Sequence, residues 1–196
     1  MPGALFFVTG NVLDRKPIFR VEKYAKAFLE VVQEMRLSYD CKIIAFVVMV
    51  DHIHLILNPK GGDIQTATGI LKSLSAKKII SLSPMDEFSK GKTNQVWQES
   101  FKSLPLWSPW MVNQKINYIH ANPVKARLCS TAEGYPWSSF RSFYRDEQNP
   151  LLQVDNERWW DGDMELLKES VKQWEAEKMS ELSKIIEDKR VGRDKC

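Results

Sequence analysis

The stretch "VMVDHIHLIL", residues 48–57, holds two of the three histidines of this chain, one residue apart in an apolar segment. The alternation of His52 and His54 with aliphatic residues predicts a β-strand, in which side chains at i and i+2 point to the same face. Two imidazoles side by side in apolar surroundings are costly unless a partner binds them, and a divalent metal ion does so well. The alternative is that neighbouring carbonyl groups or Asp51 satisfy both rings.

The segments on either side of this strand predict an α+β fold. We expect strands over 4–13, 41–50 and 96–107, helices over 21–39 and 63–82, and a polar loop over 83–95. In chain order these elements read strand, helix, strand, strand, helix, strand, which is typical of a ferredoxin-like βαββαβ domain with an antiparallel sheet. Asp51 is expected to mark a tight turn or a bulge between two adjacent strands, and Asp63 to cap the second helix.

An added helix follows this pattern and begins at Ser108, with a proline at its first helical position. Pro123 is expected to end or kink the helix, with one further turn after it. Tyr118 and Asn122 are four residues apart and share one helical face. A phenol and an amide oxygen therefore become candidate partners of the histidine pair. His120 points to the other side of the helix, and we interpret it as a surface or capping residue.

Charge is distributed unevenly along the chain. Residues 1–145 carry a net charge of +8 and residues 146–196 a net charge of −5, which together give the +3 of the whole chain. We interpret the second part as an acidic C-terminal extension, and apolar residues between Met164 and Ile185 predict that it is helical. The extension either packs on the domain or pairs two chains, so monomer and homodimer both stay open. The basic part favours a polyanionic partner such as nucleic acid, and an unevenly charged solvated surface is the alternative.

The sequence shows no membrane or export signal. No apolar run reaches the roughly 20 residues that span a bilayer, and the first ten residues lack the basic start and long apolar stretch of a signal peptide. The three cysteines show no metal-ligand spacing. These features predict a cytoplasmic protein with no membrane partner.

Four motifs follow one another along the chain: "MVDHIHLIL", "VWQESFKS", "YIHANPVKARL" and "YPWSSFRS". With "GNVLDRKPIF" near the start, they make residues 4–145 resemble the HUH single-tyrosine transposases, in particular the REP-associated tyrosine transposases. The resemblance implies a HUH single-tyrosine transposase-like domain over residues 1–145 and leaves residues 146–196 outside it.

The resemblance implies a metal-dependent endonuclease and strand transferase that cleaves and rejoins single-stranded DNA with hairpin or palindromic elements. Tyr118 is then the catalytic nucleophile, which attacks a phosphodiester, forms a 5′-phosphotyrosine and leaves a free 3′-OH. His52, His54 and Asn122 are implied to hold one Mg²⁺ or Mn²⁺ ion on the scissile phosphate. A phenol is almost entirely protonated at neutral pH, so this chemistry needs the activation that a metal ion provides.

The chain departs from the family pattern in three places. Val50 and Asp51 stand where the family usually has Pro-Asn before the first histidine, and the aspartate adds a carboxylate near the expected metal. Glu99 and Ser100 follow "WQ" where the family has glycine and a basic residue, which removes one expected phosphate contact. The polar segment 83–95 lengthens the chain between the histidines and the tyrosine.

Basic and aromatic side chains supply candidate DNA contacts. Lysine and arginine would bind phosphates in a salt-dependent way, and tryptophan would stack on unpaired bases. For each residue, core packing or a solvated surface is the alternative. The candidates are Lys72, Lys77, Lys78, Trp97, Lys102, Lys115, Lys125, Arg127, Trp137 and Arg141, with Trp107 and Trp110 as further stacking candidates.

Two other functions stay open. A domesticated protein would bind structured single-stranded DNA or RNA on the same surface without cutting it. A ferredoxin-like metal-binding or regulatory protein would have no nucleic-acid partner, and a salt-sensitive affinity for oligonucleotides would separate it from the other two. The presence together of Tyr118, His52, His54 and Asn122 favours the catalytic interpretation, because a binding module does not need all four.

Overall fold

The computed structural model describes residues 5–83, 95–99 and 101–155. Its centre is an antiparallel sheet with the strand order β2-β3-β1-β4. The strands are β1 (Leu5–Asn11), β2 (Lys42–Val48), β3 (His52–Asn58) and β4 (Lys102–Leu106). With α1 (Glu22–Ser38) between β1 and β2, and α2 (Ile64–Ser81) between β3 and β4, the chain order confirms the predicted α+β, ferredoxin-like fold.

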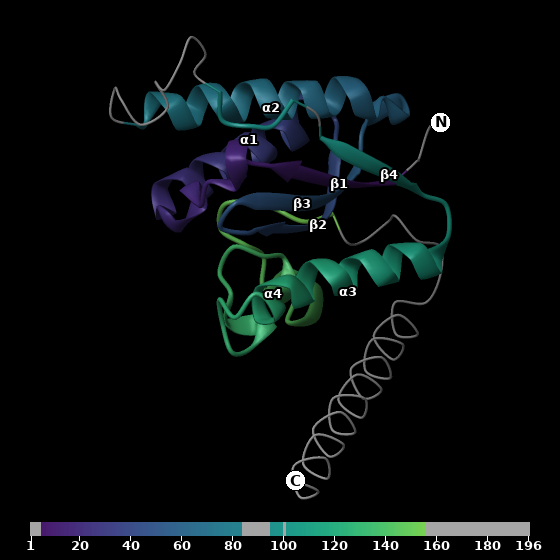
Figure 1. Cartoon of the computed structure of the whole chain (residues 1–196). Helices are drawn as coiled ribbons and strands as arrows, with labels where there is room; N and C mark the ends of the chain where they lie inside the picture. Colours follow the sequence, from purple (N-terminus) through teal and green to yellow (C-terminus); the bar gives the residue numbers. More distant parts are fainter. Residues whose placement is uncertain (1–4, 84–94, 100, 156–196) are drawn as a thin grey trace, which may run out of the picture. The chain divides into compact units, whose positions relative to one another are not determined.

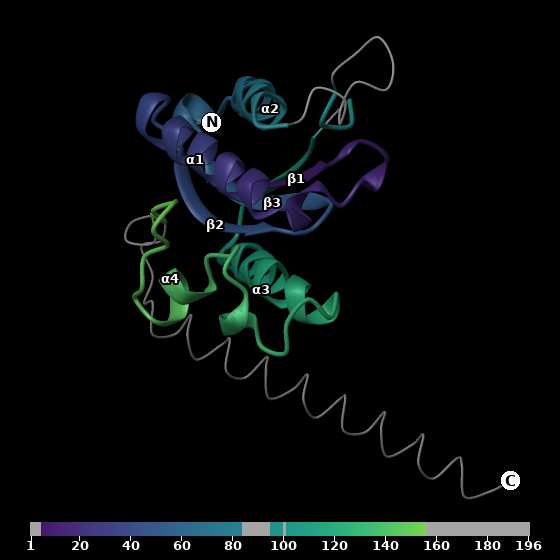
Figure 2. The ribbon, with the colours of Figure 1, turned by 90° about the vertical axis from the view of Figure 1, so that its left-hand side faces the viewer.

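Helices cover both faces of the sheet. Helices α1 and α2 lie on one face, and α3 (Pro109–Lys125) and the short α4 (Phe140–Tyr144) lie on the other (Figures 1 and 2). No helix within the described ranges is both long and apolar enough to cross a bilayer. Short 3-10 turns occur at Leu13–Arg15, Ile18–Arg20, Lys60–Gly62 and Ala132–Gly134.

Strand β3 is almost completely buried because it has a strand on each side and helices above and below. A continuous apolar run is the sequence pattern expected of such a strand. Strands β2 and β3 are joined by a tight turn that contains Asp51, as predicted, and the N–H of Met49 donates to the carbonyl of His52 at 2.8 Å. The turn is also tied to the end of β1, since Val12 N–H donates to the Asp51 carbonyl at 3.0 Å.

The predicted helix caps are present. Asp63 Oδ1 accepts from Thr66 N–H at 3.0 Å at the start of α2, and Ser108 Oγ accepts from Met111 N–H at 3.3 Å at the start of α3. Pro123 is expected to end or kink this helix before one further turn, and α3 does not end at the proline but continues to Lys125. The missing N–H of proline costs one hydrogen bond, but the next turn still closes: Ala126 N–H donates to the carbonyl of Asn122 at 2.9 Å.

The strand predicted over residues 96–107 is shorter, because β4 begins only at Lys102. Val96 and Trp97 are buried before it starts, and Trp97 forms an isolated bridge with Val12. The Trp97 indole N–H donates to Ser75 Oγ on α2 at 2.9 Å, so this segment serves the core beneath α1 and α2. Most of the predicted polar loop, residues 84–94, lies outside the described residues.

The compact unit continues past the predicted boundary at residue 145, because described residues after that position pack against the core. Leu152 and Val154 are buried in the core. The carboxylate of Asp155 accepts two bonds from the Arg36 guanidinium, at 2.8 and 2.5 Å, and one from Ile43 N–H at 2.9 Å. Residues 146–155 therefore belong to the domain, because they close over the free edge of β2. The helix predicted between Met164 and Ile185 lies outside the described residues.

Replacing Asp155 with alanine is expected to lower the free energy of unfolding by about 2–3 kcal/mol, because it leaves a largely buried guanidinium and a backbone N–H without their acceptor. Lys60→Ala is the matched control, since it removes only an exposed ion pair with Asp40 and should cost about 0.5 kcal/mol or less. Urea unfolding of both variants measures the difference. Equal effects would show that residues 146–155 are not held by this contact.

Candidate active site

The two histidines of β3 lie side by side on the face of the sheet that α3 covers. The centroids of the His52 and His54 rings are 4.9 Å apart. This follows from the two-residue period of a strand. His54 is buried, whereas His52, at the start of β3, is partly exposed. The expected shared face is therefore present, with one ring deep and one near the surface.

Each histidine uses its Nδ1 atom for a contact within the protein. His52 Nδ1 lies 2.6 Å from Asp51 Oδ1, and the other oxygen of Asp51 pairs with Arg15 Nε at 2.9 Å. His54 Nδ1 lies 2.9 Å from the hydroxyl of Thr9. The Nε2 atom of His54 is buried without a hydrogen-bond partner. A nitrogen of this kind is placed as a metal ligand would be, with its ring held from behind by a hydrogen bond.

Burial keeps both imidazoles neutral. Desolvation lowers the pKa of His54 to about 3, and the nearby positive charges of His52, Arg15 and Lys115 add to this effect. Burial also lowers the pKa of His52, although the Asp51 carboxylate acts in the opposite direction. Metal binding requires the neutral ring, so neither side chain has to lose a proton at neutral pH.

Tyr118 projects from α3 toward this pair. Its ring centroid is 5.2 Å from that of His54 and 5.8 Å from that of Phe7 on β1, which itself stacks on His54 at 5.2 Å. Tyr118 is 38% exposed, so it is not a core aromatic residue. The structure thus brings a solvent-accessible phenol to two histidines that are more than 60 residues away in the sequence.

Asn122 lies one helical turn beyond the tyrosine. Its Nδ2 donates to the carbonyl of Tyr118 at 2.9 Å, which leaves Oδ1 as the side-chain atom available to a ligand. The described part of the chain contains no group of three or more His, Cys, Asp or Glu side chains that could hold a metal. A metal ion here would therefore depend on two imidazoles and this amide oxygen, a mixed nitrogen and oxygen set that suits Mn²⁺ and permits Mg²⁺.

His120 is buried, so its interpretation as a surface or capping residue is wrong. Its Nε2 lies 2.9 Å from Ser139 Oγ, which accepts a bond from Phe46 N–H of β2 at 2.9 Å. The chain around α4 covers the side of α3 opposite Tyr118. The sequence of α3 alone does not predict this cover. His120 therefore links α3 to β2 and fixes how the helix is rotated. Its ring also contacts Phe140, Phe143 and Tyr144.

Two of the predicted DNA-binding cations lie near the tyrosine, and two more are exposed on β4 and just after α3. Lys115 Nζ is 5.7 Å and Lys125 Nζ 6.0 Å from the centroid of the Tyr118 ring. Lys102 is exposed at the start of β4, and Arg127 is exposed just after α3. The phenol is thus bordered by positive charge, as binding of a phosphate would require.

The predicted cations of α2 lie elsewhere. Helix α2 covers the face of the sheet opposite to α3, so Lys72, Lys77 and Lys78 are separated from Tyr118 by the sheet (Figure 1). Lys72 donates to the carbonyl of Glu99, and Lys78 pairs with Glu30 of α1 at 2.6 Å. These lysines serve contacts between α2 and its neighbours, so we do not place them in the site.

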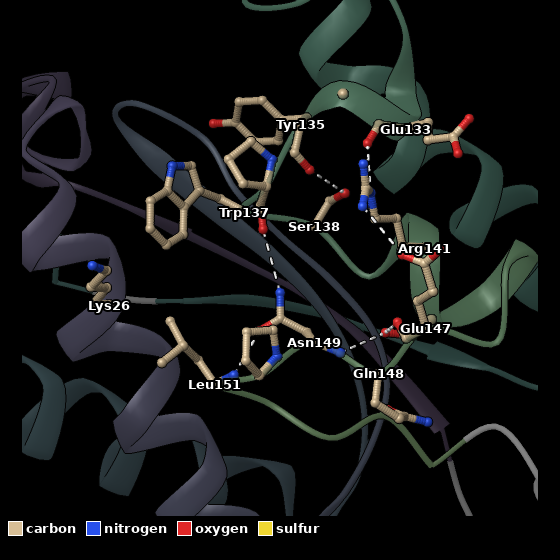
Figure 3. Close-up of a pocket in the computed structure, with 14 residues that line it drawn as sticks. Lys26, Glu133, Tyr135, Trp137, Ser138, Arg141, Glu147, Gln148, Asn149 and Leu151 are labelled. Carbon is tan, nitrogen blue, oxygen red and sulfur yellow. Dashed lines mark hydrogen bonds and ion pairs between the residues drawn. The ribbon is translucent and has the colours of Figure 1, made fainter.

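Trp97, Trp137 and Arg141 are also not part of the histidine site. Trp97 is 1% exposed and has no face open to a base. Trp137 and Arg141 line a separate cavity of about 600 Å³ formed by residues 133–151 and Lys26 of α1 (Figure 3). Arg141 is engaged there by Glu147 at 3.2 Å. The sequence motif "YPWSSFRS" therefore supports α3 through its serine and aromatic residues more than it lines the site.

Two supporting residues were not identified from the sequence. Thr9 holds His54 and Arg15 holds Asp51. Nothing local marks either residue, because Thr9 acquires its role from the register in which β1 pairs with β3, and Arg15 lies in the 3-10 turn that follows β1. That register places Thr9 opposite His54 and Asn11 opposite His52.

Comparisons with known proteins agree on one class. Residues 9–122 match the family model described as "Transposase IS200 like". A protein of Haemophilus influenzae assigned to the REP-associated tyrosine transposases is 24% identical over 172 residues, which cover 84% of this chain and 91% of the relative. The solved structure of a REP-associated tyrosine transposase bound to a REP hairpin aligns with a TM-score of 0.61 and 21% identity, over 84% of this chain and 88% of that one. This last similarity shows a shared fold.

The protein is expected to lose stability in acid because of its buried histidines. Burial lowers the pKa of His54 and of His120 to about 3, from an ordinary value of 6.5. Below pH 6.5 the unfolded chain therefore binds protons that the folded chain does not, and the free energy of unfolding falls as the pH falls toward 3. Each such histidine contributes up to about 1.4 kcal/mol per pH unit.

Carboxylates titrate in the same range, so the informative quantity is a difference between two proteins. Urea unfolding of wild type and His54→Gln at pH 7, 6 and 5 should give a shallower pH dependence for the variant, by up to one proton. An identical slope for both proteins would mean that His54 is not held neutral by burial.

Proposed function

The chain belongs to the family of IS200-like transposases, and from that premise we propose that it cleaves and rejoins single-stranded DNA next to a hairpin, through a covalent bond to Tyr118. The observation that carries the proposal is the proximity of three side chains. The ring centroid of the exposed Tyr118 lies 5.2 Å from that of His54, and the ring centroids of His54 and His52 are 4.9 Å apart. All three residues lie within the matched residues 9–122.

Tyr118 acts as the nucleophile in this proposal. Its Oη forms a bond to the phosphorus atom while the bond from phosphorus to the 3′-oxygen breaks. The phenol proton is released, and the leaving oxygen takes up a proton to become a 3′-OH. The product is a 5′-phosphotyrosine, which conserves the energy of the broken bond. A 3′-OH of another strand then reverses the step, so rejoining needs no other source of energy.

His52, His54 and Asn122 are the residues that would hold Mg²⁺ or Mn²⁺. A bound ion of this kind polarises a phosphoryl oxygen and neutralises charge that develops in the transition state. Support for this assignment comes from the unpartnered Nε2 of His54 and from the neutral state of both rings. The metal ion and its ligands are inferred from the donor atoms that the site offers.

Residues behind the ligands hold them in place. Asp51 accepts from His52 Nδ1 and so directs its Nε2 outward, and Thr9 does the same for His54. The family usually has asparagine at the position of Asp51, and here the carboxylate is shared with Arg15. This ion pair keeps the carboxylate directed away from the proposed ion, so the departure orients a ligand and does not obstruct the site.

The hairpin substrate is proposed by similarity. The aligned solved structure is of a transposase bound to a REP hairpin, and this chain has lysines beside the tyrosine that suit a phosphate backbone. Tyr118 lies beside the sheet, where we expect a single strand to reach it more easily than a duplex. We therefore propose a hairpin with a single-stranded flank as the substrate.

Tyr118→Phe is expected to abolish the covalent adduct while changing DNA affinity by about twofold or less, because only the attacking oxygen is removed. The assay is a denaturing gel of protein with labelled hairpin oligonucleotides that carry single-stranded flanks, in the presence of Mn²⁺. Tyr39→Phe, at an exposed tyrosine just after α1, is the control and should form the adduct normally. An adduct of equal yield with Tyr118→Phe would exclude it as the nucleophile. Binding without any wild-type adduct would favour a domesticated, non-cleaving protein.

His52→Ala and His54→Ala are each expected to weaken Mn²⁺ binding by tenfold or more, because each removes one of three ligands. Asp51→Asn should weaken it less, since it alters only the orientation of a ligand. Calorimetric titration of Mn²⁺ into the protein without DNA measures this directly. Asn58→Ala, at the other end of β3, is the control. Unchanged Mn²⁺ affinity in the His52→Ala/His54→Ala double variant would refute the ligand set.

A further inference from the structure

An exposed strip of side chains runs along β4 and into the start of α3. It consists of Lys102, Leu104, Trp107 and Trp110, and we call it the β4 strip. Trp107 is 74% exposed, Trp110 is 68% exposed and Leu104 is 38% exposed. Two neighbouring tryptophans with this exposure are unusual on a soluble surface, and clustered exposed apolar groups commonly mark a binding site.

The strip begins beside the proposed active site. Lys102 pairs with Thr9, and Thr9 pairs with His54, so these three residues form one row across the sheet. Paired residues of an antiparallel sheet point to the same face, and the contact between Thr9 and His54 identifies it as the face that α3 covers. Leu104 likewise pairs with Phe7, whose ring contacts Tyr118.

From that row the strip leads away from the tyrosine. Strand β4 covers four steps from Lys102 to Leu106, or about 13 Å at the rise of a β-strand. Trp107 follows directly, and Trp110 lies in the first turn of α3. The strip therefore joins a cation at the site to two aromatic side chains at a distance that a few nucleotides would span.

The charge around the strip suits a polyanion. Residues 100–132 contain three lysines and one arginine and no aspartate or glutamate. A second copy of this chain is a poorer occupant. Strand β4 is an edge of the sheet, but Pro105 lies within it, and an edge strand with a proline is a poor template for pairing with another strand.

We propose that the β4 strip binds the single-stranded DNA that flanks the scissile phosphate. Trp107 and Trp110 stack on unpaired bases, and Lys102 contacts a phosphate near the histidine row. Stacking on aromatic side chains and contacts to phosphates are the two ways in which proteins hold a single strand without reading its sequence. This inference rests on the proposed function, because it takes single-stranded DNA as the substrate of that same site.

The test compares two oligonucleotides in the binding assay, a hairpin with single-stranded flanks and the same hairpin without them. In the full-length chain, Trp107→Ala/Trp110→Ala should lose affinity for the flanked hairpin by about tenfold or more and keep its affinity for the hairpin alone. Trp107→Phe/Trp110→Phe should retain most of the flank-dependent affinity, because phenylalanine still stacks. Trp107→Leu/Trp110→Leu should lose the flank-dependent affinity, because leucine is apolar but has no ring to stack on a base.

Leu37→Ala/Tyr39→Ala is the matched control, since both residues are exposed and apolar at the end of α1, outside the strip. Equal affinities of wild type and the tryptophan-to-alanine pair for the flanked hairpin would overturn the proposal. So would a change of oligomeric state in sedimentation without a change in DNA affinity, which would make the strip an interface between copies. The adduct assay separates the two proposals: flank-dependent binding without an adduct keeps the strip and removes only the cleavage chemistry.

Discussion

The pairing of β1 with β3 is the constraint on which the candidate site depends. It places Thr9 opposite His54 and Asn11 opposite His52, so the hydroxyl that fixes the buried imidazole comes from a strand more than 40 residues away. A slip of one residue would turn every side chain of β1 to the other face of the sheet. Thr9 would then face α1 and α2, and the His54 ring would lose the hydrogen bond at its Nδ1 atom.

The second requirement is that α3 keeps its rotation about its own axis. Ile116 and Ile119 are buried toward the sheet, and His120 is joined to β2 through Ser139. These contacts bury the side of α3 that lies opposite the phenol. Tyr118 is therefore left exposed beside the histidines. The chain after α3 thus has a positioning function: it covers the edge of β2 and holds the helix that presents Tyr118.

Electrostatics at the site follow from this packing. Burial makes both histidines neutral, so they add no positive charge of their own near pH 7. The positive charge comes from lysines at the surface, where Lys115 and Lys125 flank the phenol. Neutral imidazoles inside a cationic border suit the proposed site, because the border would attract a phosphate while the unprotonated ring nitrogens would be free to bind a metal ion.

Local patterns in the sequence were sufficient to predict most of the elements, their order and the family. The two-residue period gave the shared face of His52 and His54, and the four-residue spacing gave that of Tyr118 and Asn122, because such relations depend only on local backbone geometry. The resemblance to a family, in motifs spread over about 140 residues, predicts that these two faces form one site. Helix caps were also predictable, since they use side chains within three residues of the capped N–H.

Contacts between distant segments set which side chains surround that site. Trp97 lies in the core, the lysines of α2 lie on the far face of the sheet, His120 is buried, and Asp155 belongs to the domain. Trp107 and Trp110 are left exposed at one end of an edge strand. Each of these outcomes depends on pairing and packing between segments distant in sequence, and a local pattern of residues carries no information about which distant partner will cover it.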